Sequence, residues 1–331
     1  MKLIIQIPCL NEEQTLPVTL RDLPRHIDGI SEIETLVIDD GSTDRTIEVA
    51  RQHGVHHIVR LTNRKGLASA FMAGLDAGLK LGADIIVNTD ADNQYSGNDI
   101  EKLVRDIVDH KADMVIGDRQ VETIAHFSPL KKILQKLGSW VVRHVSDTSV
   151  PDATSGFRAY SREAALRMNV ISRFTYTLET IIQAGKKNLA LSHVPVSTNG
   201  KLRESRLFTS IPAYLKRSTS TIFRIYTMYE PLKTFFIIGL VFFLPGFALA
   251  LRFLYFYFVA GGTGHVQSLI LAAVFMIVGF QIGLIGLVAD LIGGNRRLIE
   301  DALYRIKKVE LLSLQQQMSN GAVDSAEKIQ Q

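Results

Sequence analysis

The chain has 331 residues, of which 47% are hydrophobic and 21% charged. This composition excludes a disordered chain, and the length suits about two domains. The single cysteine, Cys9, excludes an intrachain disulfide and a cysteine-based zinc cluster, which favours a reducing compartment for most of the chain. The formal net charge is +4, but the basic residues flank the most apolar stretches, so we expect no nucleic-acid partner.

The first 200 residues or so alternate short β-branched runs with helical patterns. The runs predict buried strands at Leu3 to Ile7, Thr35 to Ile38, His57 to Leu61, Asp84 to Val87 and Met114 to Ile116. The intervening patterns predict helices at Thr15 to His26, Thr43 to Gln52, Leu67 to Leu81 and Asp99 to His110. This order predicts a doubly wound, mostly parallel α/β sheet.

Polar turns follow the expected strands, at the sheet edge where doubly wound folds bind ligands. The sharpest is Asp90-Ala91-Asp92, since two carboxylates after a buried strand can hold a hard divalent ion that in turn binds two phosphates. In Asp39-Asp40-Gly41-Ser42, Ser42 suits a helix cap, and the adjacent carboxylates suit hydrogen bonds to a base and a ribose. Neither a dinucleotide-binding nor a P-loop glycine motif follows these strands.

Two long apolar runs, Thr234 to Val259 and Val266 to Ala289, each exceed the ~20 residues that cross a bilayer. We expect two transmembrane helices; the alternative is a buried hairpin of a soluble protein. Lysines and arginines precede and follow the pair, which predicts that both termini are cytoplasmic. The amphipathic stretches Ile211 to Tyr229 and Leu298 to Leu314 are typical of interfacial helices. The motif Gly279-x-x-x-Gly283 permits close helix packing, including in a homo-oligomer.

Together these motifs resemble glycosyltransferase family 2, which has the GT-A fold. The resemblance rests on Pro8-x-x-Asn11-Glu12, Asp39-Asp40-Gly41-Ser42-x-Asp44, Asn63-x-x-Gly66 and Asp90-Ala91-Asp92-x-Gln94. With Asp152-x-x-Ser155-Gly156-Phe157-Arg158 and two C-terminal spans, the chain is similar to polyprenyl-phosphate glycosyltransferases of the bactoprenol glucosyltransferase type, relatives of dolichol-phosphate mannose synthases.

The resemblance implies a cytoplasmic GT-A catalytic domain at residues 1–207, a juxtamembrane amphipathic helix at 208–231 and a transmembrane hairpin at 232–292. The hairpin would be followed by an interfacial helix at 293–317 and a frayed tail at 318–331. The implied protein is a multi-pass enzyme of the plasma (inner) membrane that serves the cell envelope.

The implied reaction moves one sugar, glucose from UDP-glucose, onto undecaprenyl phosphate with inversion at the anomeric carbon. The partners are thus a nucleotide-sugar, a polyprenyl phosphate and the bilayer. Alternatives are a GDP-mannose or UDP-aminoarabinose donor, or a non-catalytic membrane-anchored subunit that binds sugar nucleotides. A processive polysaccharide synthase is disfavoured because its Q-x-x-R-W motif is absent.

By the same resemblance, each site residue has an expected partner. Asp92, aided by Asp90, would hold Mg²⁺ or Mn²⁺, and Gln94 would lie near the sugar. Asp152 would act as catalytic base or orient the acceptor, although a phosphate with a second pKa of about 6 needs no strong base at pH 7. The nucleotide would contact Pro8, Leu10, Glu12, Asp39, Asp90 and Ala91, and the lipid phosphate would contact Arg119, Arg203 and Lys131.

Overall fold

The computed structural model describes residues 1–120, 129–171, 175–200, 211–261 and 266–329. For residues 129–137, 211–218, 260 and 318–329 within these ranges, the structure describes the backbone alone. The chain divides into two compact units, one formed by Met1–Ile222 with Tyr304–Gln331 and the other by Phe223–Leu303.

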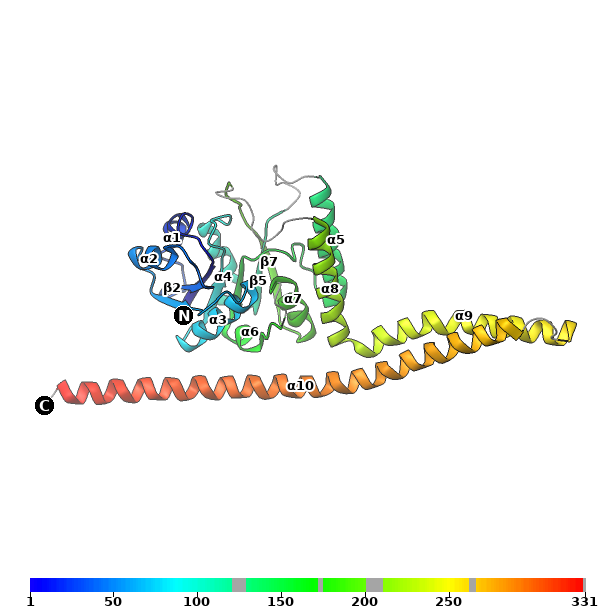
Figure 1. Ribbon diagram of the computed structural model, residues 1–331. Helices are drawn as coiled ribbons and strands as arrows, with labels where there is room; N and C mark the ends of the chain where they lie inside the picture. The colour runs from blue at the N-terminus through cyan, green and yellow to red at the C-terminus, as the bar shows by residue number, and fades with distance from the viewer. Residues whose placement is uncertain (121–128, 172–174, 201–210, 262–265, 330–331) are drawn as a thin grey trace. The chain divides into compact units, whose positions relative to one another are not determined.

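A sheet forms the centre of the first unit (Figure 1). It has seven strands in the order β3-β2-β1-β4-β6-β5-β7. The strands are β1 (Lys2–Cys9), β2 (Glu32–Asp39), β3 (His57–Arg60), β4 (Ile85–Asn88), β5 (Met114–Asp118), β6 (Arg158–Ser161) and β7 (Leu191–Pro195). All neighbouring pairs are parallel except those of β6, which runs antiparallel to both β4 and β5. The predicted mostly parallel α/β architecture is confirmed.

Helices cover both faces of this sheet. On one face, α1 (Leu16–Asp22), α2 (Thr46–Gln52) and α4 (Ile100–Val108) share a core with Leu3, Ile5 and Ile7. A short 3-10 turn, Gly97–Asp99, leads into α4. On the other face, α3 (Leu67–Lys80) approaches β1, β2 and β4 so closely that Gly74 faces Gln6. Next to α3 lies α6 (Arg162–Arg167), while α7 (Thr177–Lys186) packs against α5 (Pro129–Ser146).

All five predicted strands and four predicted helices are present, with shifted ends. Helix α1 ends at Asp22, shortly before Pro24, because the residue preceding a proline disfavours helical backbone. Helix α2 starts only at Thr46 because residues 42–44 are hydrogen-bonded to the turn after β1. The prediction missed β6, β7, α5, α6 and α7. Strand β6 contains only four residues and begins with a buried arginine, so it carries no apolar run.

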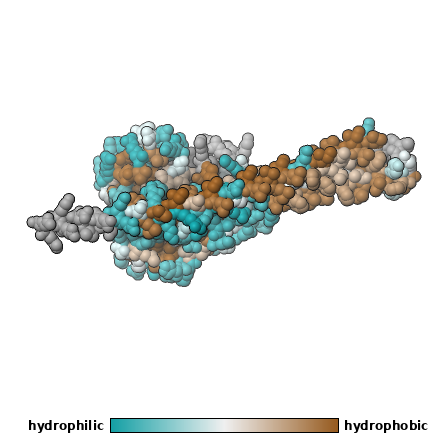
Figure 2. All heavy atoms as spheres, turned by 90° about the horizontal axis from the view of Figure 1, so that it is seen from below, coloured by the Kyte–Doolittle hydropathy of each residue, from teal (hydrophilic) through white to brown (hydrophobic). Residues whose placement is uncertain are grey.

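The second unit contains two long apolar helices, α9 (Pro231–Ala260) and the first part of α10 (Val266–Ile329). Both are long and apolar enough to cross a membrane, and only 17% of each apolar window is buried. Figure 2 shows mostly apolar residues on the visible face of the hairpin. A helix in the core of a soluble protein would be mostly buried, so these exposed apolar surfaces indicate membrane association.

Close backbone contact joins the two helices of the hairpin. A Cβ atom built on Gly239 would lie 2.7 Å from the Gly279 carbonyl oxygen, and one on Gly279 would lie equally close to the Gly239 carbonyl. Only glycine allows this approach. The predicted close packing at Gly279 is therefore found between α9 and α10, within one chain.

Helix α10 continues without a break beyond the predicted boundary at residue 293. From Tyr304 onward it belongs to the first unit, where the Tyr304 hydroxyl donates to Glu163 (3.0 Å) and Lys80 pairs with Glu310 (3.1 Å). One side of this segment thus packs on α3 and α6. Helix α8 (Ile211–Tyr229) covers most of the predicted juxtamembrane helix. The lipid contacts of both segments stay predictions, as does the fraying of the tail, where helical backbone continues to Ile329.

Candidate active site

The sheet brings the turns after β1, β2 and β4 together. Cys9 and Asp39, the last residues of β1 and β2, are register partners, and the Asp40 amide donates to the Cys9 carbonyl (2.9 Å). On the other side of β1, the Thr89 amide donates to the Gln6 carbonyl (3.1 Å). The polar turns predicted from the sequence therefore lie side by side at one edge.

Side-chain hydrogen bonds connect the turn after β1 to the turn after β2. The Asn11 amide donates to Ser42 Oγ (2.9 Å), and the Thr43 amide donates to Asn11 Oδ1 (2.8 Å). Ser42 was predicted to cap the following helix, but α2 has no side-chain cap, and the Ser42 hydroxyl serves this cross-link instead. The predicted nucleotide ligand Glu12 is buried and accepts from Thr15 Oγ1 (2.6 Å), so its carboxylate stabilises the turn.

The adjacent acids Asp39 and Asp40 have different environments. Asp40 Oδ1 and Oδ2 accept the backbone N–H groups of Lys65 (2.7 Å) and Gly66 (2.9 Å). Asp39 is fully buried; its Oδ1 accepts the Ser42 amide (3.1 Å). Among the described residues, its Oδ2 has no hydrogen-bond donor, and Arg60 Nε lies 3.8 Å away. Asp40 therefore connects the third turn to the second, while the predicted contact of Asp39 with the nucleotide stays a prediction.

The Asp90-Ala91-Asp92 turn is fixed through its backbone and its last acid. The buried Ala91 carbonyl accepts from Thr19 Oγ1 (2.9 Å). Both carboxylate oxygens of Asp92 accept from Gln94, one from its amide N–H (3.2 Å) and one from its side-chain Nε2 (2.9 Å). Gln94, predicted to lie near the sugar, is therefore in direct contact with the predicted metal ligand Asp92.

Asp90 lies against the loop that precedes β6. A Cβ atom built on Gly156 would lie 3.3 and 3.4 Å from the Asp90 carboxylate oxygens and 2.8 Å from the Tyr176 hydroxyl. No larger residue fits here without displacing one of these groups. The loop before β6 and the turn after β4 consequently share one wall of the site.

A network of buried polar side chains holds the Gly156 loop in place. Asn88 Nδ2 donates to the Gly156 carbonyl (2.9 Å) and to the Tyr176 hydroxyl (2.8 Å), and the Gly156 amide donates to the Tyr95 hydroxyl (3.1 Å). Burial raises the pKa of both tyrosines, so they remain neutral donors and acceptors. Sequence reasoning missed this network. Its signal was present, because Gln6, which donates to Asn88 (2.9 Å), and Asn88 itself are polar residues inside apolar strands.

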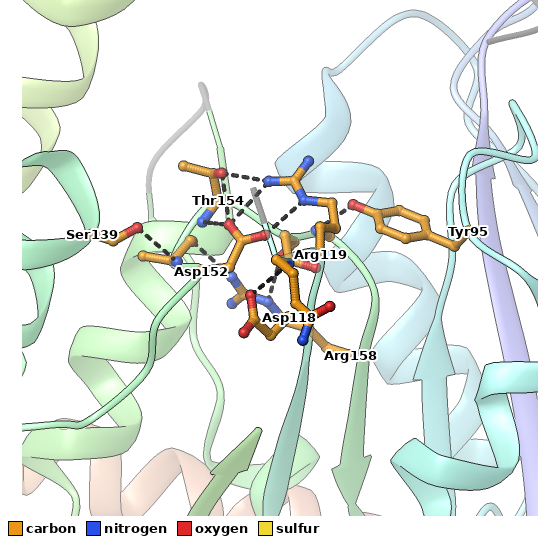
Figure 3. A network of polar contacts seen from close by, with 11 residues as sticks. Tyr95, Asp118, Arg119, Ser139, Asp152, Thr154 and Arg158 are labelled. Carbon is orange, nitrogen blue, oxygen red and sulfur yellow. Dashed lines mark hydrogen bonds and ion pairs between the residues drawn. The ribbon is translucent and has the colours of Figure 1, made fainter. Parts of the chain in front are cut away.

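The same edge carries a buried ion pair (Figure 3). Arg119 follows β5 directly, and its Nε and Nη2 atoms donate to the two oxygens of Asp152 at 2.7 and 3.0 Å. Nη2 also donates to Thr154 Oγ1 (2.6 Å). Arg119 is 13% exposed and Asp152 is 2% exposed. Sequence reasoning placed both residues in the site, and the structure shows them bound to each other.

This pairing controls the protonation state of Asp152. Burial alone would raise the pKa of its carboxyl group, but the charge and hydrogen bonds of Arg119 outweigh burial and hold the pKa below its ordinary value. Burial likewise disfavours the charged Arg119, yet the ionisable groups of Tyr95 and Asp152 raise the pKa of the guanidinium overall. Asp152 is thus a weakly basic carboxylate.

Arg158, which closes the motif Asp152 to Arg158, is a structural residue. Its fully buried guanidinium donates to the carbonyl oxygens of Ala153 (2.9 Å), Ser155 (2.7 Å) and Thr177 (2.8 Å). Ser139 Oγ on α5 accepts the Ala153 amide (3.2 Å). Figure 3 shows Arg158 and Ser139 beside the Arg119–Asp152 pair. The loop that holds Asp152 is therefore attached to α5 and α7.

The remaining predicted ligands are placed as follows. Pro8 is buried within β1, and Leu10 lies half-buried in the turn after it. The side chain of Lys131 and the whole of Arg203 lie outside the described residues. Their predicted contacts with the nucleotide and the lipid phosphate stay predictions, as do the ligand roles of the other predicted site residues.

Asp90 and Asp92 offer oxygen ligands, the kind that Mg²⁺ and Mn²⁺ prefer. Within the described ranges, no three His, Cys, Asp or Glu residues form a metal-binding group. A hard ion at this pair would therefore take further ligands from water and substrate phosphates, as Mg²⁺ usually does. Cys9 is buried, and burial raises the pKa of its thiol, so it does not compete for the ion. The residues present fit such an ion.

Comparisons with known proteins agree with this architecture. Residues 4–167 match the model of glycosyl transferase family 2. The chain is 32% identical over 206 residues to an uncharacterised glycosyltransferase of Mycobacterium tuberculosis, covering 61% of this chain and 88% of that protein. It is 27% identical over 304 residues to an undecaprenyl-phosphate 4-deoxy-4-formamido-L-arabinose transferase of Photorhabdus laumondii, covering 88% of this chain and 89% of that protein.

A solved structure shares the fold. It is the glucosyl-3-phosphoglycerate synthase of M. tuberculosis with Mn²⁺, UDP-glucose and phosphoglyceric acid, with a TM-score of 0.53 and 18% identity over 68% of this chain and 78% of that one. The sheet is thus GT-A-like. The chain belongs to glycosyltransferase family 2 and is a glycosyltransferase.

Proposed function

We propose that this protein is a membrane-anchored inverting glycosyltransferase that moves one glucosyl group from UDP-glucose to undecaprenyl phosphate. One observation carries the proposal. A buried arginine lies at the same strand edge as the Asp90/Asp92 carboxylate pair, in a chain that also has two helices long enough to cross a membrane. A cation beside a donor site suits an anionic acceptor, and apolar helices suit an acceptor that is a lipid.

Asp39 is the proposed ligand of the donor base. Uracil presents an N–H group between two carbonyl oxygens, so it needs one acceptor flanked by donors. Asp39 Oδ2 supplies the acceptor, and the Arg60 guanidinium beside it supplies a donor. Guanine presents two adjacent N–H groups, and Asp39 has only one oxygen, Oδ2, that lacks a donor among the described residues, so one of these N–H groups would find no acceptor on this side chain. This arrangement favours UDP over GDP, and Pro8, Leu10 and Glu12 would shape the rest of the nucleotide site.

Asp92, with Asp90, would hold Mg²⁺ or Mn²⁺ against the donor diphosphate. Such an ion stabilises the negative charge that develops on the leaving diphosphate as the bond to the sugar breaks. Gln94 keeps both oxygens of Asp92 oriented. The Ala91 carbonyl, held by Thr19, keeps the turn in place near the ribose and diphosphate.

The acceptor phosphate would bind Arg119, assisted by Arg203 and Lys131. Two donor atoms of Arg119 are engaged by Asp152 and Thr154, while its Nη1 group has no hydrogen-bond partner in the described part of the chain. The phosphate is largely dianionic at pH 7, so its oxygen can attack the anomeric carbon without losing a proton. We therefore assign Asp152 the role of orienting Arg119 and the acceptor. This replaces a role as catalytic base.

The proposed topology follows the sequence prediction. Residues 1–207 form the cytoplasmic catalytic domain, 232–292 span the inner membrane, and 208–231 and 293–317 lie at its surface. The relative from P. laumondii supports this arrangement, because its alignment extends over 88% of this chain. Because that relative is named as a 4-deoxy-4-formamido-L-arabinose transferase, an aminoarabinose-type donor is the second candidate.

A single assay tests the proposal. The full-length protein in nanodiscs is incubated with undecaprenyl phosphate, Mg²⁺ or Mn²⁺, and radiolabelled UDP-glucose, GDP-mannose or UDP-aminoarabinose. We expect transfer of label to the lipid with UDP-glucose. Lipid labelling only from another donor would overturn the choice of sugar. Nucleotide binding with no transfer from any donor would support a non-catalytic subunit instead.

A further inference from the structure

Helix α5 carries an exposed tryptophan that the proposed reaction does not use. Trp140, the only tryptophan of the chain, is 54% exposed and stacks on His144 one turn later, with ring centroids 5.5 Å apart. A tryptophan buries more apolar area than almost any other side chain, so exposing half of it to water is costly. We take this exposed aromatic pair as a candidate interaction surface and ask what its helix would bind.

The opposite side of α5 is an ordinary core surface. Ser139, Val142 and Ser146 are buried where α5 packs against α7, and Ser146 Oγ donates to the Val142 carbonyl (2.6 Å). This packing fixes the rotation of the helix. Trp140 and His144 must therefore point away from the domain.

The composition of α5 indicates what covers this surface. Its sequence contains Lys131, Lys132, Lys136 and Arg143 and no acidic residue. Tryptophan prefers the headgroup level of a bilayer, where its ring is buried and its N–H remains hydrated. Basic residues on the same helix attract anionic headgroups. A helix that combines both features, in a chain with two helices able to span the membrane, fits a lipid surface better than a soluble partner.

One hydrogen bond connects this surface to the candidate site. Ser139, the residue before Trp140, accepts the Ala153 amide (3.2 Å), and Ala153 lies between Asp152 and Thr154, both of which bind Arg119 (Figure 3). A helix held at the membrane surface would therefore hold the proposed acceptor-binding arginine there as well.

We propose that α5 is a second membrane-contact element, separate from the hairpin, with Trp140 at the headgroup level. It presents the Arg119–Asp152 pair to the lipid acceptor. The contact itself is independent of the reaction, while its effect on the acceptor rests on the proposed function.

The lone tryptophan allows a direct test in the wild-type protein. Fluorescence is recorded in nanodiscs whose lipids carry bromine on the acyl chain near the headgroup, and again in unbrominated nanodiscs with added iodide. We expect bromine to quench Trp140 and iodide to have little access. Trp140→Phe gives the background. In that background, Phe258→Trp on the exposed surface of α9 provides the membrane reference and Arg51→Trp on α2 the water reference.

Two results would overturn the contact. Trp140 emission that iodide quenches like the α2 reference, with no effect of bromine, would leave the helix in water. Protection from both quenchers would indicate a protein surface, such as a second copy of this chain. Bromine quenching of Trp140 as weak as that of the Arg51→Trp reference, combined with protection from iodide, would likewise indicate that a protein surface covers Trp140.

A kinetic comparison tests the effect on the acceptor. Trp140→Ala is expected to raise KM for undecaprenyl phosphate about tenfold, equivalent to about 1.4 kcal/mol of lost surface binding. KM for the nucleotide-sugar should not change. Trp140→Phe keeps an aromatic ring, so its KM for undecaprenyl phosphate should stay close to that of the wild type. An unchanged acceptor KM in Trp140→Ala would remove the link to the site. Bromine quenching without any lipid glycosylation would overturn the proposed acceptor and leave the membrane contact in place.

Discussion

The guanidinium of Arg119 and the carboxylate of Asp152 form a two-point ion pair with contacts of 2.7 and 3.0 Å, in a place where Asp152 is almost inaccessible to water. The two residues come from different elements, one from the end of β5 and one from the loop before β6. A pair of this kind is geometrically strict, because a planar fork meets a planar carboxylate. Each residue therefore determines the orientation of the other.

A double-mutant cycle measures this dependence. Asp152→Asn should lower the rate of transfer strongly, because Arg119 loses its orientation, and should cost about 3–5 kcal/mol of stability by leaving a buried charge unpaired. Arg119→Gln should cause similar losses. The double variant should be little worse than either single variant, because both act through one interaction. Transfer rates and unfolding midpoints of the four proteins give the coupling.

Additive losses would mean that the residues act separately. Asp152 would then recover its role as a base. An Asp152→Asn protein with near-wild-type turnover would instead remove Asp152 from the mechanism.

The pH dependence of transfer separates the substrate from Asp152. The folded pKa of Asp152 lies below its unfolded value of about 3.9, so the pair stabilises the protein above that pH and is lost only as the pH falls through the lower folded pKa. Asp152 should therefore not titrate between pH 5 and 9. We expect kcat/KM for the acceptor to fall below about pH 6, as its phosphate gains a proton.

The control for this profile is Asp152→Asn. Its activity, although lower, should decline at the same pH as the wild type. A decline in the pH–activity profile that is present in the wild type and absent from Asp152→Asn would instead report the titration of Asp152.

Asp39, the last residue of β2, and Asp40, which follows it, should respond differently to substitution by asparagine. Asp40→Asn places an amide group where both carboxylate oxygens accept backbone N–H groups, so it should lower the free energy of unfolding by about 1–3 kcal/mol. Asp39→Asn removes a buried charge whose partner, Arg60, is 68% exposed, and its Oδ1 can still accept the Ser42 amide. We expect unchanged or higher stability but at least tenfold weaker UDP binding.

Calorimetric titration with UDP and thermal unfolding of both variants check this contrast. Arg60→Ala, which leaves the carboxylate in place but removes the donor beside it, should weaken UDP binding. Equal loss of stability in the two Asn variants would contradict the assignment.

The sequence predicts the half of the site that lies on regular strand ends. The residues after β1, β2 and β4 are found together because parallel strands place their carboxyl ends at one edge. The contribution of the loop before β6 could not be predicted in the same way, because β6 runs antiparallel and is too short and polar to be recognised. The sequence of an Asp-Asp pair also does not reveal which of the two carboxylates accepts backbone N–H groups. That depends on where the turn containing residues 65 and 66 lies relative to β2.

Gly156 offers the most selective test of how the two halves of the site meet. An alanine there would place its methyl carbon 2.8 Å from the Tyr176 hydroxyl and 3.3 Å from an Asp90 oxygen, so one neighbour must move. We expect a cost of about 1–3 kcal/mol in stability and, because Asp90 is a proposed metal ligand, weaker Mn²⁺-dependent UDP binding. Tyr176→Phe removes the closest oxygen and also a hydrogen-bond partner of Asn88, so Gly156→Ala should cost less stability in the Tyr176→Phe background than in the wild type. The Mn²⁺ dependence of the double variant should recover less, since the contact with Asp90 remains. Recovery of both properties together would show that the tyrosine clash alone disturbs the site and that Asp90 does not depend on this glycine.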